Sequence, residues 1–230
     1  MNNHLENIKN EPGSVIAAVI NFVQSPNKLF GDGLLFVEAL ILTLISVYAV
    51  RLIGVPEPGL IGIVLASAAM TPRLNQILEL NRARIWSGEG NGRRVNLASM
   101  ISGLSLFSGM FVAFMAIGIV SSDAVLIKDF NFIVTRIQLD TNTVLSPERF
   151  SQGVSIFQHN LSVLITLALM SFVYRSLGAM FALGWNAGLW GVTIVLFMGG
   201  GRDTELNTVV YGTMILIAII PHLIVEAASY

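Results

Sequence analysis

The sequence predicts an all-α membrane protein, a polytopic bundle of about six transmembrane helices formed by residues 1–230 as a single domain. Hydrophobic residues make up 54% of the 230 residues and charged residues only 12%, whereas soluble domains carry about 25% charged residues. The mean hydropathy of +0.73 agrees, because a soluble globule needs more polar residues to cover its surface. These figures exclude a soluble globule, a disordered chain and a disulfide-stapled secreted domain.

The charge balance and the residue types exclude several kinds of chemistry. The net charge is −1 and cysteine is absent, so we expect no bulk attraction to nucleic acid, no disulfide and no thiol nucleophile. Three histidines restrict metal chemistry to mixed sites with carboxylates, and we predict neither a metal site nor a cofactor. The chain has no P-loop, HExxH or GxSxG motif, so we expect a protein that is not an enzyme.

Residues 1–32 are predicted to form a cytoplasmic or interfacial segment. Charged residues precede the first apolar run, so the N-terminus is no cleaved secretory signal and the first span should be an uncleaved anchor. Residues 15–24 predict a helix too short to cross a bilayer. Either this helix lies in the membrane interface, or it packs on the cytoplasmic ends of the bundle.

Residues 33–120 contain the first three predicted spans, at about 33–53, 60–71 and 97–120. The second is short and rich in small residues, and three arrangements stay open for it: tilted, re-entrant or continued into the next segment. Glu38 lies in the first two turns of span one, where we expect its carboxylate to reach headgroup water.

A polar stretch at residues 72–96 separates spans two and three and fixes the predicted orientation. It holds five of the ten arginines, which we interpret as topology anchors: Arg73, Arg82, Arg84, Arg93 and Arg94. Short loops rich in Lys and Arg stay in the cytoplasm. This loop is therefore predicted to be cytoplasmic, with the N-terminus inside and, for six spans, the C-terminus inside as well.

Residues 121–153 are predicted to form a small extracytoplasmic element, where alternating Phe130, Phe132 and Val134 are typical of a hairpin. Residues 154–230 then supply spans four to six, at about 154–174, 177–198 and 209–230. Arg175 is expected to anchor the inner turn between spans four and five. The chain stops at Tyr230 without a polar tail, so either this tyrosine lies at the interface or a further span follows.

Pro221, His222 and Glu226 form the sharpest polar group inside a predicted span. An ionisable side chain in the membrane costs about 2.5–3.5 kcal/mol on insertion scales and is a functional candidate by default. His222 and Glu226 share one helix face, and Pro221 frees a carbonyl one turn earlier. A functional interpretation of these residues is a proton relay, an ion site or a substrate contact. The structural interpretation, which we favour, is a hydrogen-bonded contact between helices.

Two further groups carry polar or small side chains within spans. His159 and Asn160 begin span four, where hydrogen bonding to a neighbouring span is favoured over metal binding. Asn186 lies among glycines whose spacing is typical of close helix packing, namely Gly184, Gly188 and Gly191.

These motifs, in the order His159-Asn160, Gly184-Trp185-Asn186-Ala187-Gly188 and Pro221-His222 followed by Glu226, resemble the stage II sporulation protein M family over about residues 150–230. The resemblance implies a multi-spanning protein of a prokaryotic cell membrane that works in a larger complex. It implies family-defining roles for Asn160, Asn186, Pro221, His222 and Glu226. The sequence departs from the family in having Leu223 after Pro-His, Ala187 after Asn186, and three spans before the extracytoplasmic segment rather than one.

The leading functional hypothesis is a non-enzymatic membrane scaffold, whose partners are the lipid bilayer and other membrane subunits or copies of itself. The first alternative is the permease subunit of an ATP-driven exporter, in which residues 74–80 would touch an ATPase subunit. The second is a proton or ion pathway through His222 and Glu226.

Overall fold

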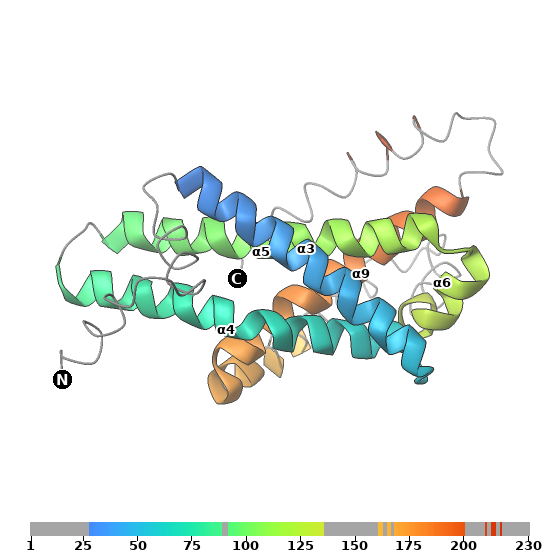
Figure 1. The fold of residues 1–230 in the computed structure, drawn as a ribbon, viewed down its shortest axis with the longest axis horizontal. Coiled ribbons are helices and arrows are strands. Elements are labelled where there is room, and N and C mark those ends of the chain that lie inside the picture. Colours follow the sequence, from blue (N-terminus) through green and yellow to red (C-terminus); the bar gives the residue numbers. More distant parts are fainter. Residues whose placement is uncertain are drawn as a thin grey trace, which may run out of the picture.

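The structure is a computed structural model, and it describes residues 28–88, 92–135, 161–162, 165–166, 168–200, 210, 213–214 and 217. Its long elements are α3 (Lys28–Ile53), α4 (Pro58–Trp86), α5 (Gly92–Val120) and α9 (Ser176–Gly200), with a short α6 (Asp123–Asp129) after α5 (Figure 1). No strand occurs in these described ranges. The all-α prediction is therefore confirmed for this part of the chain.

The four long helices form a bundle in which each has two main neighbours. Both α3 and α9 pack against α4 and α5, and α4 and α5 also touch each other across the centre. Helix α4 runs opposite to the other three, as the contacting pairs show: Asp32–Ser102, Arg51–Ser121, Glu38–Arg73, Gly184–Met110 and Gly118–Val195. One end of the bundle therefore carries the arginines of the α4–α5 connection, and the other carries α6.

Three helices are long and apolar enough to cross a membrane, at Gly31–Ile53, Gly92–Val120 and Ser176–Met198. They coincide with the first, third and fifth predicted spans. A membrane protein is therefore supported by three apolar helices in the described part of the chain. The predicted spans two, four and six are not among these three helices.

Of the three arrangements left open for the short second span, the structure shows continuation into the next segment. Residues 60–71 belong to α4, a single helix of 29 residues that continues through Pro72 to Trp86. Proline removes one intrahelical hydrogen bond, but Leu74, on the next turn, is buried in the core and holds the helix on its course. The predicted polar loop is therefore helical over 72–86 and, as the first turns of α5, over 92–96.

The predicted hairpin after span three was wrong for the described residues. Residues 123–129 form α6, and residues 131–135 are helical as well. The buried apolar side chains are Leu126, Phe130, Ile133 and Val134, a spacing of four, three and one that fits one face of a helix. The alternation at residues 130–134 covered too few positions to decide between a strand and a helix. The rest of the predicted element, residues 136–153, lies outside the described residues.

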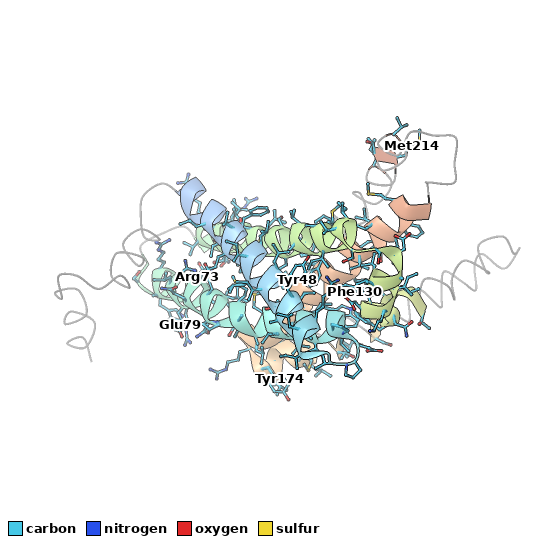
Figure 2. All side chains as sticks on the ribbon, turned by 45° about the vertical axis from the view of Figure 1, so that its right-hand side comes forward. Tyr48, Arg73, Glu79, Phe130, Tyr174 and Met214 are labelled. Carbon is cyan, nitrogen blue, oxygen red and sulfur yellow. The ribbon has the colours of Figure 1, made fainter. Side chains whose placement is uncertain are left out.

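Phe130 closes the end of the bundle that carries α6. Its ring is fully buried and meets Phe114 edge-on, with 6.1 Å between the ring centroids. Gly59, at the start of α4, allows this approach, because a Cβ there would lie 2.5 Å from the Phe130 ring. Figure 2 shows Phe130 toward this end and Arg73 and Glu79 toward the opposite end.

Candidate functional site

Five of the predicted site residues lie outside the described residues. They are His159, Asn160, Pro221, His222 and Glu226. The predicted pairing of His222 with Glu226 therefore stays a prediction. Among the residues that the structure describes, no group of three or more His, Asp or Glu side chains is placed to hold a metal ion.

Asn186, the remaining polar motif residue, is buried in the middle of α9. Only 8% of it is exposed, and its Nδ2 donates a hydrogen bond of 3.0 Å to the carbonyl oxygen of Ala182 one turn earlier. This bond within α9 satisfies one donor of the buried amide, as is usual for buried polar groups.

The three glycines of α9 lie where this helix comes close to α4 and α5. A Cβ at Gly184 would collide with the Ser67 hydroxyl of α4, and one at Gly188 would lie 2.6 Å from Ile63 Cδ1. At Gly191 a Cβ would lie 3.0 Å from Phe114 Cβ on α5. Small residues let helix axes approach in this way.

The centre of the bundle between these helices is apolar and closed. The side chains that fill it are fully buried, and they come from α4, α5 and α9: Ile63, Ala66, Met70, Met110, Phe114, Met180 and Ala187. The buried polar residues of these helices are Ser67, Asn186 and Thr193, and the Ser67 hydroxyl has no hydrogen-bond partner. The described helices thus pack around a mainly apolar core.

An ion pair that the sequence did not predict joins α3 to the α6 end. Arg51 Nε lies 2.6 Å from Asp129 Oδ2, with side-chain exposures of 18% and 5%. Another nitrogen of Arg51, Nη2, donates a 3.0 Å hydrogen bond to the Ser121 hydroxyl. In the sequence, Arg51 and Asp129 each lie beside an apolar helical face. This pattern indicates that each charge needs a partner but does not predict that the two form a pair.

At the opposite end, Arg73 joins α4 to α3. Its Nε lies 3.1 Å from Glu38 Oε2, too poorly aligned for a hydrogen bond, and its Nη1 donates a 3.0 Å hydrogen bond to Gln76 Oε1. Glu38 therefore reaches an arginine rather than headgroup water alone. Arg73, expected as a surface anchor, has a side chain that is only 15% exposed.

The other predicted anchors differ in their surroundings. Arg82, Arg84, Arg93 and Arg94 are all exposed, on the last turns of α4 and the first turn of α5. Arg175 has a backbone φ of 51° and makes the turn into α9.

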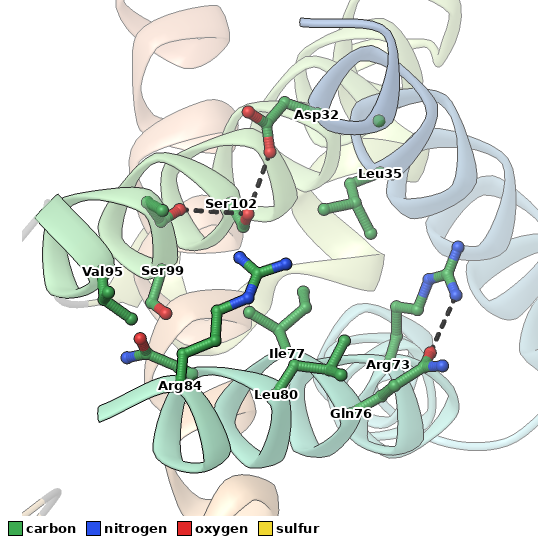
Figure 3. Close-up of a pocket in the computed structure, with 13 residues that line it drawn as sticks. Asp32, Leu35, Arg73, Gln76, Ile77, Leu80, Arg84, Val95, Ser99 and Ser102 are labelled. Carbon is green, nitrogen blue, oxygen red and sulfur yellow. Dashed lines mark hydrogen bonds between the residues drawn. The ribbon is translucent and has the colours of Figure 1, made fainter. Parts of the chain in front are cut away.

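A cavity of about 150 Å³ opens between α3, α4 and α5 at the arginine-rich end (Figure 3). Its lining is mixed polar and apolar, and comes from the first turns of α3, the second half of α4 and the first turns of α5: Gly31, Asp32, Leu35, Arg73, Gln76, Ile77, Leu80, Asn81, Arg84, Val95, Ala98, Ser99 and Ser102. This cavity is absent from the sequence-based predictions, because it depends on α4 continuing as a helix beyond Pro72.

Comparison with known proteins adds no family: no family model matches the chain, and no curated protein or solved structure is similar enough to count as a match.

Proposed function

We propose that the protein is a non-enzymatic scaffold of the membrane, a subunit that holds other membrane proteins or copies of itself in a larger assembly. The observation that carries this proposal is the close-packed, mainly apolar centre of α4, α5 and α9. A transport pathway needs polar groups lining a wet passage, whereas large apolar side chains, namely Ile63, Met110, Phe114 and Met180, are fully buried in this centre.

The two ends of the bundle support the same role. Arg51–Asp129 fastens α3 to the α6 end, and Glu38–Arg73 fastens α3 to α4 toward the arginine-rich end. Arg51 follows Glu38 by 13 positions, so the two ion pairs are separated by about 20 Å along α3. Two ion pairs at different heights along α3 favour one fixed arrangement of the helices. A fixed arrangement suits a scaffold subunit that positions other proteins.

We further infer that the chain lies in the cell membrane of a prokaryote as a multi-pass protein of about six spans. The arginine-rich end would face the cytoplasm, since five arginines concentrate there, and this places the N-terminus inside. The resemblance of residues 150–230 to the stage II sporulation protein M family supports the same environment.

The experiment is extraction of the full chain from its native membrane in mild detergent, followed by native mass spectrometry. We expect either a stoichiometric partner or a homo-oligomer whose protein mass is a multiple of 24.9 kDa. A folded monomer that persists across extraction conditions would overturn the scaffold proposal. A co-purifying nucleotide-binding subunit would replace it with the exporter permease.

Two glycine variants of α5 control for loss of the fold. Gly109 touches the α3 backbone, and Gly103 has no atom within 4 Å of an added Cβ. Gly109→Ala should unfold at a lower temperature than the wild type and lose its partners at that temperature, whereas Gly103→Ala should do neither. Partners that stay bound above the unfolding temperature of Gly109→Ala would show that the bundle is not what holds them.

A further inference from the structure

The cavity at the arginine-rich end contains polar groups that lack partners. Arg84 forms no ion pair with any carboxylate in the described part of the chain. Figure 3 shows its guanidinium pointing from α4 into the cavity, toward Ser102 of α5. Asn81 Nδ2 donates a 3.3 Å hydrogen bond to Asn96 Oδ1, but its own Oδ1 is buried with no hydrogen-bond partner. The cavity thus offers a free cation and an unused acceptor.

These groups define the chemistry of a ligand that would fit. A guanidinium prefers a phosphate or carboxylate oxygen, and the unused amide oxygen needs a hydroxyl or other donor. A cation is disfavoured by Arg73 and Arg84, and a purely apolar ligand would leave both Arg84 and Asn81 unpaired. The matching ligand is a phosphate with a neighbouring hydroxyl group.

The volume sets the size of that ligand. The volume of the cavity is about 150 Å³. Pockets for drug-sized ligands begin at about 300 Å³, so a nucleotide is too large. A phosphate bearing a short polyol fits the space.

The position of the lining residues indicates where such a ligand comes from. Gly31 and Asp32 begin the apolar helix Gly31–Ile53, and Val95 lies in the first turn of the apolar helix Gly92–Val120. The cavity is therefore at the level where two membrane-spanning helices end, which is the headgroup region of the bilayer. Basic pockets between helices at this level bind anionic lipids.

We propose that this cavity binds the headgroup of an anionic phospholipid, with the phosphate on Arg84 and a headgroup hydroxyl on Asn81. This site goes beyond the scaffold role and does not depend on it. Asp32 is the opposing charge inside the cavity, where its Oδ1 accepts a 2.9 Å hydrogen bond from Ser102. It limits the affinity for an anion.

The test uses the purified full chain in detergent with equal amounts of phosphatidylglycerol and phosphatidylcholine, and counts bound lipids by native mass spectrometry. Incubation at about 0.5 M salt screens the general attraction of exposed arginines. We expect the wild-type chain to prefer phosphatidylglycerol. Arg84→Gln should reduce this preference about tenfold or more, the effect of losing a hydrogen bond between charged groups.

Arg82→Gln is the matched control, because Arg82 is exposed on the same turn of α4 and does not line the cavity. It should change the preference less than about twofold once salt screens surface charge. Asp32→Asn keeps an acceptor for Ser102 and removes the opposing charge, so it should raise the retention of phosphatidylglycerol. Because Arg84 is exposed, Arg84→Gln should unfold at the wild-type temperature.

Three results would overturn the proposal. An equal loss of phosphatidylglycerol preference in Arg82→Gln and Arg84→Gln would show that surface electrostatics alone cause the binding. The site would be ruled out if the wild-type chain shows no preference for phosphatidylglycerol and Asp32→Asn does not raise it. Displacement of phosphatidylglycerol by millimolar inorganic phosphate would assign the cavity to free phosphate instead of lipid, whereas retention under that competition supports the headgroup.

Discussion

Gly109 of α5 lies where α3 and α5 come too close together to accept a larger side chain. A Cβ there would collide with the carbonyl oxygen of Phe36 and lie 2.9 Å from Ala39 Cβ and 3.1 Å from Leu40 N. Two of these three contacts are with backbone atoms of α3, which cannot rotate away as a side chain can. Since carbon atoms pack best at about 3.5–4.0 Å, Gly109→Ala must push α3 and α5 apart by roughly 1 Å.

Overpacking a well-filled core costs about 1–3 kcal/mol, and this site belongs at the upper end because the backbone must move. Alanine also favours the helix over glycine by about 1 kcal/mol, which would hide part of the cost. Gly103 lies on the same helix, and a Cβ added there has no atom within 4 Å. Gly103→Ala should therefore gain the same helix propensity without a clash. The difference between the two variants therefore isolates the cost of the contact.

We expect Gly109→Ala to have a free energy of unfolding about 2–3 kcal/mol below that of Gly103→Ala. Reversible unfolding in mixed micelles of mild detergent and sodium dodecyl sulfate, followed by far-UV circular dichroism, measures both variants. Equal stabilities, within about 0.5 kcal/mol, would refute close packing of α3 on α5.

Three further variants test individual contacts by the same unfolding measurement. Asp129→Asn should lower the free energy of unfolding by about 1.5–3 kcal/mol, because it removes a buried charge facing Arg51. The double variant Arg51→Met with Asp129→Leu should recover most of that loss, as apolar replacements of both partners often do, and no recovery would contradict the ion-pair assignment. Ser67→Ala should be as stable as the wild type or about 1 kcal/mol more stable, because the hydroxyl is buried without a partner, and a clear loss would show a missed hydrogen bond. Asn186→Leu should cost less than about 2 kcal/mol, the upper range for such hydrogen bonds in membrane bundles, and a larger loss would assign Asn186 a greater structural role.

The sequence predicted those helices whose apolar runs are so long that length and composition identify them without knowledge of tertiary contacts. Residues 33–53, 97–120 and 177–198 correspond closely to α3, α5 and α9, because their length and composition leave few alternatives to a helix in lipid. The continuation of α4 beyond Pro72 was only one of three arrangements left open, since local rules end or kink a helix near a proline. What holds it there is the burial of Leu74, a tertiary contact that no local rule contains.

The sites divide in the same way. The spacing of Gly184, Gly188 and Gly191 indicated close packing, but not that the neighbours are α4 and α5. The Arg51–Asp129 pair joins residues 78 positions apart, and such a pairing follows from the direction of the helices rather than from either residue. The cavity beside Arg84 is likewise created by three helices meeting, so composition alone gave only a basic loop.

The central claim is that a dry bundle crosses the membrane with its arginine-rich end inside, and cysteine labelling tests it most directly. The chain has no cysteine, so Ser87→Cys, Ser122→Cys and Ala187→Cys each introduce a single thiol without background. Ser87 and Ser122 are exposed at opposite ends of the bundle, and Ala187 is fully buried in its centre.

With an impermeant maleimide on intact cells, we predict that Ser122→Cys reacts at once, Ser87→Cys reacts only after the membrane is opened, and Ala187→Cys does not react in either case. Reaction of both end positions from the same side would contradict a membrane-crossing bundle, and reaction at Ala187→Cys in the folded protein would contradict a dry centre.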